Sequence, residues 1–432
     1  MKICMIGTGY VGLVSGACFA DLGNTVYCVD KDQEKIDMLN SGEIPIYEPG
    51  LKEIVKKNYF SNRLKFTNDL AKAVRFSDIV FICVGTPTSK KNKSADLSFV
   101  FNVAKEISKN INKFKIIVVK STVPVTTGDK IEKIISKKIN KKLFEVVSNP
   151  EFLREGEAIR DFRYPDRIVI GSNNNKIAKK LEFLYAPLIK KGSIFFPTSR
   201  RGAEMIKYAS NAFLATKISY INEIANFCEK TEVNVEDVSL GMGLDKRIGS
   251  RFLRAGPAYG GSCFPKDTKA ITVTADSFKT NLSIIKSVIN SNSNRRILLI
   301  KRIENILSNK IKNKKITILG VTFKPNTDDM RESTSLLMLP YLNKRGAQVI
   351  YYDPSGEKKE FKKLKNVLFV NDCNEACLKA DLIIIHTEWD EFKSIDFKKI
   401  CKNRNLKIYD MRNLYSSKKM KNSGLNYYSI GR

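Results

Sequence analysis

Residues 2–13 read Lys-Ile-Cys-Met-Ile-Gly-Thr-Gly-Tyr-Val-Gly-Leu, an apolar run that leads through a G-x-G-x-x-G pattern into a helix-like stretch. Glycines in this pattern permit a tight turn and let the backbone approach a pyrophosphate at a helix N-terminus. Asp30 ends the next apolar run, where its carboxylate can accept hydrogen bonds from ribose hydroxyls and would repel a 2′-phosphate. These features predict a site for NAD rather than NADP. The alternative is a glycine-rich turn without a ligand.

Short apolar runs rich in β-branched and aromatic residues recur at both ends of the chain and predict two parallel sheets. The N-terminal runs are residues 2–7, 25–30, 79–85, 115–121, 144–149 and 167–172, and the C-terminal runs are 314–320, 347–353, 366–370, 381–387 and 406–410. The second C-terminal run ends in Tyr-Tyr-Asp and resembles the run that ends at Asp30. No G-x-G-x-x-G follows the first C-terminal strand, so we expect no second dinucleotide site of the same kind.

The region between these sheets reads as helical. Residues 201–230 lack proline and carry apolar residues at helical spacing, which predicts one long helix that bridges domains or builds a dimer interface. Another helical region follows over 266–308. We therefore predict an α/β protein with two Rossmann-like, doubly wound parallel-sheet domains joined by a central helical domain. The expected boundaries are 1–200 for the NAD-binding domain, 201–310 for the central domain and 311–432 for a nucleotide-sugar-binding domain.

The composition is that of a globular protein, except for its charge. The 432 residues carry 75 Lys and Arg against 45 Asp and Glu, a net charge of +30. Basic residues are spread along the chain, so we interpret them as a solvated surface that attracts acidic nucleotide sugars rather than as a nucleic-acid site. Nine scattered cysteines fit no disulfide framework and favour a reducing cytoplasm. We predict no metal site and find no apolar run long enough to span a bilayer.

Residues 260–267 read Gly-Gly-Ser-Cys-Phe-Pro-Lys-Asp and place Cys263 on a flexible turn before a predicted helix. Pro265 suits the first helical position, so Cys263 would lie near the positive end of a helix dipole and beside Lys266. Both effects favour the thiolate, which is the nucleophilic form. The alternative is an inert, buried cysteine.

Further polar residues occur in pairs or at strand ends. Asn149 followed by Pro150 predicts a cap and a helix start, which would put Glu151 and Glu155 on one helix face. Lys207 and Asn211 are also four apart, within the long apolar helix. A solvated helix face is the alternative for each pair. Thr86 and Thr122 follow strands, at the edge where ligands bind in open α/β sheets, although either could be a mere turn residue.

Seven segments together resemble one known family closely. They are GTGYVGL at 7–13, VGTPT at 84–88, KSTVP at 120–124, NPEFLREG at 149–156, EMIKYASNAFLATKISYINEIA at 204–225, GMGLDKRIGSRFLRAGPAYGGSCFPKD at 241–267 and FKPNTDDMRES at 323–333. They occur in the order found in the family of UDP-glucose 6-dehydrogenases, within the UDP-glucose/GDP-mannose dehydrogenase superfamily. The resemblance covers nearly the whole chain. It implies NAD as cofactor, UDP-glucose as substrate and a homodimer.

The resemblance also implies roles for individual residues. The implied catalytic residues are Cys263 as nucleophile, Lys207 and Asn211 as oxyanion donors, Thr122 beside the reacting carbon, and Asp267 and Glu151 as groups that orient water and carry protons. The implied NAD contacts are Gly7, Gly9, Tyr10, Val11, Gly12, Asp30, Lys35, Thr86, Thr122, Glu155, Lys266 and Arg331. The implied substrate contacts are Glu151, Phe152, Leu153, Arg154, Glu155, Lys207, Asn211, Arg247, Phe252, Leu253, Arg254, Ala255, Gly256, Gly260 and Lys324. Arg247 resembles an arginine that reaches a neighbouring subunit, and Arg254 stands where some relatives carry histidine or asparagine.

The implied chemistry needs such residues. An aldehyde has no hydride to lose until a nucleophile adds to it, so oxidation of a primary alcohol to an acid needs a group such as a thiolate. Each tetrahedral stage carries an oxyanion that a fixed lysine and amide stabilise. Three alternatives remain: the same reaction on GDP-mannose or an N-acetylated UDP-hexose, a basic nucleic-acid-binding protein on a dehydrogenase fold, and a single-step hydroxyacid dehydrogenase that needs no cysteine.

Overall fold

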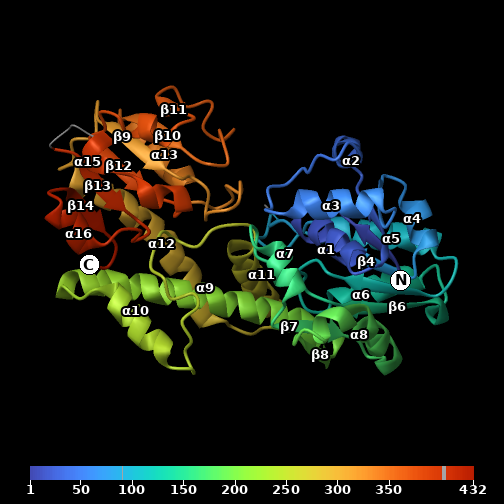
Figure 1. Cartoon of the computed structure of the whole chain (residues 1–432). Coiled ribbons are helices and arrows are strands. Elements are labelled where there is room, and N and C mark those ends of the chain that lie inside the picture. The colour runs from blue at the N-terminus through green and yellow to red at the C-terminus, as the bar shows by residue number, and fades with distance from the viewer. Residues whose placement is uncertain (90, 401–404) are drawn as a thin grey trace. The chain divides into compact units, whose positions relative to one another are not determined.

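The computed structural model describes residues 1–89, 91–400 and 405–432 (Figure 1). Contacts divide the chain into two compact units. The N-terminal unit comprises Met1–Ser210 with Lys269–Thr280, and the C-terminal unit comprises Asn211–Thr268 with Asn281–Arg432. Each unit contains one sheet.

The N-terminal unit is built on an eight-stranded sheet of order β3-β2-β1-β4-β5-β6-β7-β8 (Figure 1, blue to green). Its strands are β1 (Lys2–Ile6), β2 (Thr25–Val29), β3 (Leu64–Thr67), β4 (Ile79–Ile82), β5 (Lys115–Val119), β6 (Phe144–Ser148), β7 (Arg167–Gly171) and β8 (Ile194–Thr198). Its helices are α1 (Tyr10–Asp21), α2 (Gln33–Asn40), α3 (Leu51–Phe60), α4 (Leu70–Phe76), α5 (Ser98–Asn110), α6 (Thr127–Ser136), α7 (Ala158–Arg163) and α8 (Asn175–Ile189), with a 3-10 turn η1 (Lys141–Leu143).

Both faces of this sheet are buried. In β1, Ile3 and Met5 join a cluster with residues of α1, α3 and α8, whereas Cys4 and Ile6 join a second cluster with residues of α4, α5 and α6. This alternation follows from the two-residue period of a strand. It explains why the strands read as continuous apolar runs, because each residue meets helices on one face or the other.

The predicted strands of this unit are confirmed, with two differences. Strands β3 and β8 are not predicted from the sequence, since each is only four or five residues long and polar or proline-containing. The strand predicted at 167–172 exists as β7, but it pairs with β6 in the antiparallel sense, while the other strand pairs of the sheet are parallel.

The predicted long helix is α9 (Arg200–Thr231), 32 residues without a break. The second helical region is confirmed as two helices, α11 (Phe264–Ser277) and α12 (Ser283–Ile306), separated by residues 278–282. A further helix, α10 (Val235–Leu244), escaped the sequence analysis because it contains Gly241 and Gly243.

The sheet of the C-terminal unit has the order β11-β10-β9-β12-β13-β14, and each of its strand pairs is parallel. Its strands are β9 (Lys315–Leu319), β10 (Gln348–Tyr352), β11 (Val367–Phe369), β12 (Leu382–Ile385), β13 (Lys407–Asp410) and β14 (Asn426–Ser429). Its shorter helical elements are α13 (Ser335–Lys344), α14 (Cys373–Cys377), η2 (Asp390–Ser394), α15 (Phe397–Ile400) and α16 (Ser417–Asn422). The five predicted strands are present, and β14 is an additional one. The predicted fold class is thereby confirmed.

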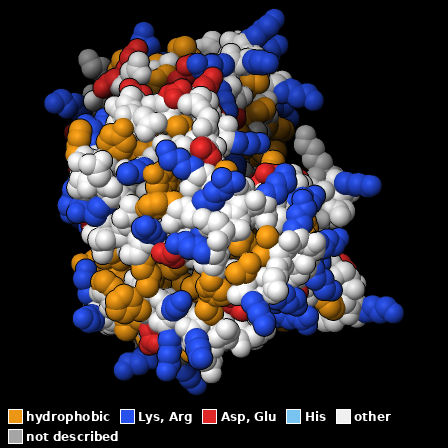
Figure 2. Space-filling view, turned by 90° about the vertical axis from the view of Figure 1, so that its right-hand side faces the viewer, with side chains coloured by type: hydrophobic (Ala, Val, Ile, Leu, Met, Phe, Trp, Pro, Cys, Tyr) orange, Lys and Arg blue, Asp and Glu red, His pale blue; other side chains and the backbone are white. Residues whose placement is uncertain are grey.

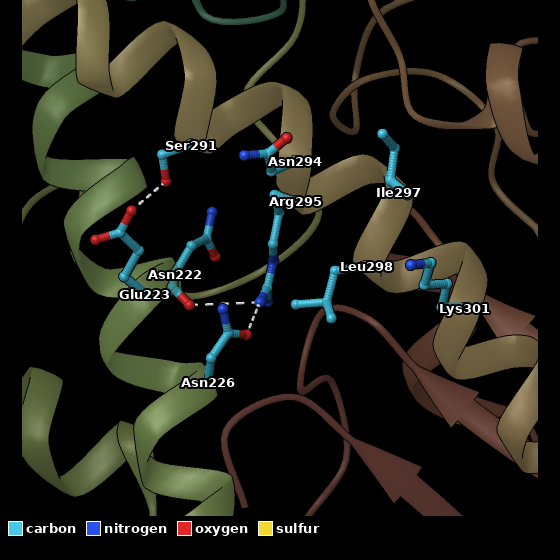
Figure 3. A pocket seen from close by; sticks show the side chains of 9 residues that line it. All are labelled: Asn222, Glu223, Asn226, Ser291, Asn294, Arg295, Ile297, Leu298 and Lys301. Atoms are coloured by element: carbon cyan, nitrogen blue, oxygen red, sulfur yellow. Dashed lines mark hydrogen bonds between the residues drawn. The ribbon is translucent and has the colours of Figure 1, made fainter.

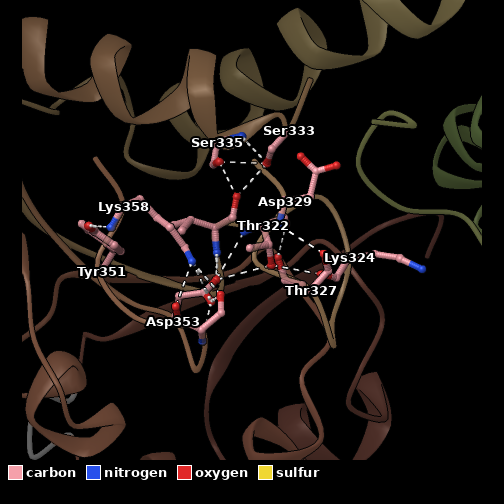
Figure 4. A network of polar contacts seen from close by, with 12 residues as sticks. Thr322, Lys324, Thr327, Asp329, Ser333, Ser335, Tyr351, Asp353 and Lys358 are labelled. Atoms are coloured by element: carbon pink, nitrogen blue, oxygen red, sulfur yellow. Dashed lines mark hydrogen bonds and ion pairs between the residues drawn. The ribbon is translucent and has the colours of Figure 1, made fainter. Parts of the chain in front are cut away.

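The C-terminal sheet has an acidic residue, Asp353, where the N-terminal sheet has Asp30. Groups of the protein itself bind the Asp353 carboxylate (Figure 4). Asp353 follows β10 and is fully buried. Its carboxylate accepts hydrogen bonds from the N–H groups of Val321 at 2.7 Å and Ser355 at 2.9 Å, and the Lys358 Nζ lies 3.9 Å away. A ribose would have to compete with these partners. The second sheet thus differs from the first at the position that selects a dinucleotide.

Lysine and arginine side chains are scattered over the face shown in Figure 2, interspersed with apolar and uncharged side chains. They do not gather into one stripe on that face, which fits the interpretation of the net charge as a solvated surface. Within the described parts of the chain, no helix is long and apolar enough to cross a membrane.

Candidate functional site

The turn after β1 has the geometry of a dinucleotide cradle. Gly7 has a φ of +104°, and a Cβ at Gly12 would lie 1.8 Å from the Gly7 carbonyl oxygen. Glycine is therefore required at both positions, first for the turn and then for the contact between helix and turn. Gly9 is different: it caps α1 without a side chain, and a Cβ there would meet no atom within 4 Å. The open space beside Gly9, at a helix N-terminus that no side chain of the cap residue occupies, fits a bound pyrophosphate.

Asp30 lies at the end of β2, half-buried, and is anchored to the glycine turn. Its Oδ2 accepts hydrogen bonds from the Thr8 N–H at 2.9 Å and the Thr8 hydroxyl at 2.7 Å, and its Oδ1 accepts one from the Asp32 N–H at 3.2 Å. Burial opposes the charge, but these hydrogen bonds and nearby Lys35 outweigh it and lower the pKa of Asp30. The carboxylate is thus an anion at neutral pH, with a lone pair on Oδ1 left for a ribose hydroxyl.

Two predicted cofactor residues from neighbouring strands lie together. The Thr86 hydroxyl donates to the Thr122 carbonyl oxygen at 2.9 Å, which ties the loop after β4 to the loop after β5. The Ser121 hydroxyl adds a second link by donating to the Val84 carbonyl oxygen at 2.7 Å. These loops end at the carboxyl edge of the sheet, beside the glycine turn, where open α/β sheets bind ligands.

Glu151 and Lys207 form a buried ion pair in the N-terminal unit. The Lys207 Nζ lies 3.2 Å from the Glu151 Oε1, and each side chain is 4% exposed. The other carboxylate oxygen of Glu151 accepts the Leu153 N–H. Lys207 also lies over the ring of Phe152, 5.0 Å from its centroid. A lysine held in this way is a fixed positive charge in a site with little water, as oxyanion stabilisation requires.

The prediction of a helix that starts after Asn149 is wrong. Residues 151–154 are irregular and α7 begins only at Ala158, so Glu151 and Glu155 do not share a helix face. Asn149 caps nothing, because its amide braces the sheet: Nδ2 donates to the Val169 carbonyl oxygen at 3.0 Å, and Oδ1 accepts from the Tyr185 hydroxyl at 2.6 Å. Glu48 caps α7 instead, accepting the N–H groups of Gly156 and Ala158.

Asn211 and Asp267 form the corresponding contact in the C-terminal unit. The Asn211 Nδ2 donates to the Asp267 Oδ2 at 2.6 Å, and the Lys266 Nζ lies 2.5 Å from Asp267 Oδ1. Asp267 is completely buried, so its carboxylate is compensated by these two neighbours. Lys207 and Asn211 are one turn apart on α9, and both are buried.

Cys263 is the residue that directly precedes α11. Its carbonyl oxygen accepts the Asp267 N–H at 2.8 Å, the first hydrogen bond of that helix. The thiol is partly exposed, and the Ser262 hydroxyl lies 3.4 Å from Sγ. The helix starts two residues earlier than predicted, with Pro265 at its second position. This position, at the N-terminal end of α11, is one where the helix dipole would favour an anionic sulfur, as the sequence indicates.

The remaining predicted substrate and cofactor residues differ in how they are held. Phe252 has a φ of +66°, and Gly260 packs so closely that a Cβ would lie 2.7 Å from the Glu332 carbonyl oxygen. The Arg254 guanidinium donates to the Arg412 carbonyl oxygen at 2.8 Å. Arg331 pairs with Asp329. Arg247 pairs with Asp245, and the Arg247 side chain is 88% exposed. Lys324 extends away from the buried network around Asp353 (Figure 4).

Two buried charged residues escaped the sequence analysis. Lys120, in the Lys-Ser-Thr segment after β5, donates to the Asn149 Oδ1 at 3.3 Å, and burial lowers its pKa to about 8 although Cys83 and Glu151 oppose that shift. Glu204, one turn before Lys207, accepts the N–H groups of Thr126 and Gly128, each at 2.7 Å. It thereby caps α6, which has no capping side chain of its own. The position of Lys120 at a strand end was a usable signal, whereas the backbone partners of Glu204 leave no sequence pattern.

A glycine turn between strand and helix, with an anionic Asp30 at the end of the next strand, defines the class of NAD-dependent dehydrogenases with a Rossmann-like domain. Comparison with protein families gives three matches in sequence order. Residues 1–189, 201–294 and 317–417 match the NAD binding domain, the central domain and the UDP binding domain of the UDP-glucose/GDP-mannose dehydrogenase family. The chain belongs to this family, and NAD is its cofactor. The resemblance deduced from the motifs is confirmed.

Individual relatives agree over the full length. The chain is 48% identical over 435 residues to UDP-glucose 6-dehydrogenase of Rhizobium meliloti (strain 1021), with 100% of both chains covered. It is 46% identical over 440 residues to UDP-glucose 6-dehydrogenase TuaD of Bacillus subtilis (strain 168), covering 100% of this chain and 93% of that one. The solved structure of a UDP-glucose dehydrogenase from the hyperthermophilic archaeon Pyrobaculum islandicum superposes with a TM-score of 0.90 and 34% identity, over 99% of this chain and 96% of that one.

The two glycines give a matched pair of variants. We expect Gly12→Ala to lower the free energy of unfolding by about 3 kcal/mol, because its Cβ would collide with backbone. Gly9→Ala should cost about 1 kcal/mol or less, since its Cβ meets open space, yet weaken NAD at least about tenfold by crowding the pyrophosphate. Thermal unfolding and NAD titration by calorimetry measure the two effects. Equal NAD affinity in Gly9→Ala and the wild type would contradict the assignment of the space beside Gly9 to the pyrophosphate.

Glu204 gives a prediction for pH. Burial raises its pKa from 4.5 to about 7, against the hydrogen bonds from Gly128 and Thr126. The folded state then holds a proton that the unfolded state releases, so the stability of this unit falls as pH rises from about 4.5 to about 7, with each pKa unit corresponding to about 1.4 kcal/mol. Glu204→Gln cannot titrate and should flatten this dependence in thermal unfolding between pH 5 and 8. Glu106→Gln, at a half-exposed position on α5, is the control and should keep the wild-type slope.

Proposed function

We propose that this protein oxidises UDP-glucose to UDP-glucuronate in two NAD-dependent steps, with Cys263 as the nucleophile. The observation that carries the proposal is the setting of Cys263: it is partly exposed, it directly precedes α11, and a buried carboxylate, Asp267, follows one turn later with Asn211 bound to it. Single-step dehydrogenases have no use for such a cysteine. The family match to a UDP binding domain and the similarity to two UDP-glucose 6-dehydrogenases support UDP-glucose as the substrate.

Bound NAD would accept one hydride in each oxidation. In the first, the C6 alcohol loses a hydride and a proton and becomes an aldehyde. The Cys263 thiolate then adds to the aldehyde carbon, and the C=O bond becomes a C–O⁻ bond of a thiohemiacetal. Loss of the second hydride re-forms the C=O bond as a thioester. Water attacks the thioester, the C–S bond breaks, and the acid and the thiolate are released. For each UDP-glucose, two NAD are reduced, one water is consumed and three protons are released.

The contacts described above, each within its own unit, support a role for each candidate residue. Lys207, charge-paired with Glu151, and the amide of Asn211 would stabilise the oxyanion of the tetrahedral stages. Glu151 and Asp267 are carboxylates that could orient the attacking water and carry protons, and Thr122 would contact both cofactor and substrate through its place at the sheet edge. Removing one oxyanion donor typically costs on the order of 10²–10³ in rate.

The number of NADH formed per UDP-glucose consumed tests this proposal. We expect two for the wild type, and for Cys263→Ser a stall at the aldehyde stage or at an ester that hydrolyses slowly, with unchanged NAD affinity. Matched assays with GDP-mannose and an N-acetylated UDP-hexose test the alternative substrates. One NADH per substrate, or full turnover by Cys263→Ser, would exclude the covalent mechanism. Turnover with GDP-mannose but not with UDP-glucose would show that GDP-mannose is the substrate.

We also infer that the protein is a homodimer that associates through α9 and α10. Phe213, Tyr220 and Phe227 follow one another at intervals of seven residues along α9, and they are 65%, 48% and 66% exposed. Leu240 and Leu244 of α10 are exposed as well. Residues seven apart lie on one helix face, and large exposed apolar surfaces mark protein interfaces. A second copy of the chain fits best, because such a stripe on a long helix pairs with itself across a twofold axis.

The mass in solution tests the dimer. Phe213→Glu combined with Phe227→Glu should convert a dimer to a monomer, measured by sedimentation equilibrium, because charged groups would be buried in the interface. Phe60→Glu is the matched control, since Phe60 is 79% exposed on α3 outside this stripe and should leave the mass unchanged. An unaltered mass in the double variant would contradict this interface. We propose that exposed Arg247, which pairs with Asp245, reaches the partner's site.

A reducing cytoplasm is the proposed location. Eight cysteines lie in the described part of the chain, and all eight are free thiols. Burial raises the pKa of Cys18 to about 12, so such thiols stay protonated and unreactive.

A further inference from the structure

The segment that leads to Cys263 has no helix or strand of its own. Residues 252–262 follow α10 and precede α11, and most of residues 253–261 are buried. Buried backbone N–H and C=O groups need hydrogen-bond partners, which a regular element would supply internally. In this segment side chains from other elements supply them, so its conformation depends on those side chains.

Asn292 of α12 binds both polar groups of one residue in the segment. The Tyr259 N–H donates to Asn292 Oδ1 at 2.8 Å, and Asn292 Nδ2 donates to the Tyr259 carbonyl oxygen at 3.0 Å. The amide thus pairs with Tyr259 as a neighbouring strand would. Asn292 is 6% exposed, so water does not replace these bonds readily.

Gly256 is held from both sides as well, by the side chains of Asn222 and Arg295 that Figure 3 shows. Its N–H donates to Asn222 Oδ1 of α9 at 2.9 Å, and its carbonyl oxygen accepts from Arg295 Nε of α12 at 3.2 Å. The Arg295 guanidinium is fixed in turn by the Asn222 carbonyl oxygen and the Asn226 side chain. Burial lowers the pKa of Arg295 to about 10, which leaves it charged at neutral pH. A residue with a Cβ at position 256 would also crowd the Arg412 side chain, 3.4 Å away.

Arg296 completes the contact next to the cysteine. Its guanidinium donates to the carbonyl oxygens of Tyr259 at 3.2 Å and Glu332 at 2.9 Å, and it pairs with the Glu332 carboxylate at 2.8 Å. The Gly261 N–H, two residues before Cys263, donates to the Arg331 carbonyl oxygen at 2.7 Å. Asn292, Arg295 and Arg296 occupy positions i, i+3 and i+4, so one face of α12 is devoted to this segment.

We propose that Asn292, with Asn222 and Arg295, acts as a set of positioning residues that fix residues 255–261 and thereby the location of the Cys263 Sγ. This inference rests on the proposed role of Cys263. None of the three residues touches reacting atoms; they act through the backbone that carries the cysteine. A displacement of about 1 Å at a reacting group can cost on the order of 10² in rate.

Asn292→Asp and Asn292→Ala test the inference, with Asn294→Ala, an exposed position two residues further along α12, as the matched control. Asn292→Asp preserves shape and the acceptor for Tyr259 N–H, but turns the donor into an oxygen that repels the Tyr259 carbonyl. We expect both Asn292 variants to lower kcat about 10- to 100-fold with unchanged KM for NAD. The rate at which iodoacetamide alkylates Cys263, followed by peptide mass spectrometry, should change at least about threefold. Asn294→Ala should match the wild type in both.

The outcomes separate this inference from the proposed function. If Cys263→Ser abolishes formation of the second NADH while both Asn292 variants keep the wild-type kcat and alkylation rate, the positioning role is wrong and the mechanism stands. If Cys263→Ser turns over normally, the mechanism is wrong, and the alkylation rates alone still decide whether Asn292 positions the cysteine. A loss of kcat in Asn292→Ala with normal alkylation and a normal Asn292→Asp variant would point to packing and overturn the inference.

Discussion

One helix carries charged and polar side chains on a face that the fold buries, and each of them has to be compensated. On α9, Glu204, Lys207 and Asn211 follow at intervals of three and four residues, and all are nearly inaccessible to water. Their partners are the N–H groups that begin α6, the carboxylate of Glu151 and the carboxylate of Asp267. An uncompensated charge at such a position would be strongly destabilising. The loops that supply these partners are therefore fixed by electrostatics as much as by packing.

The sequence predicts features whose determinants are local. The glycine turn, the long helix and the longer strands depend on periodicity and on backbone freedom, and the structure has them. Short strands such as β3 and β14 were missed because four residues do not establish a period. The helix expected after Asn149 fails because its amide is engaged by Val169 and Tyr185, which are far away in sequence. The candidate site residues were predicted from motifs. Glu204 and Asn292 bind backbone atoms of segments that are remote in sequence, and such contacts produce no recognisable spacing of residues.

Asp30 and Asp353 show how one topology yields two kinds of sheet edge. Each follows the second strand of its sheet and accepts hydrogen bonds from the loop after the first strand. Asp30 remains half-exposed beside glycines that leave room for a ligand, while Asp353 is enclosed by Val321, Ser355 and Lys358. The carboxylate at this position therefore does not identify a dinucleotide site by itself. The space in front of it does, and that space is created by the glycine turn.

The segment before Cys263 is held by amide and guanidinium groups, and this has a consequence for how the protein responds to acidity. Asparagine side chains do not titrate, and Arg295, whose pKa burial lowers only to about 10, stays protonated at neutral pH. The contacts that Asn292, Asn222 and Arg295 make with Tyr259 and Gly256 should therefore persist across the range in which carboxylates, imidazoles and thiols exchange protons. A dependence of turnover on hydrogen-ion concentration would therefore not originate in the contacts that hold Tyr259 and Gly256.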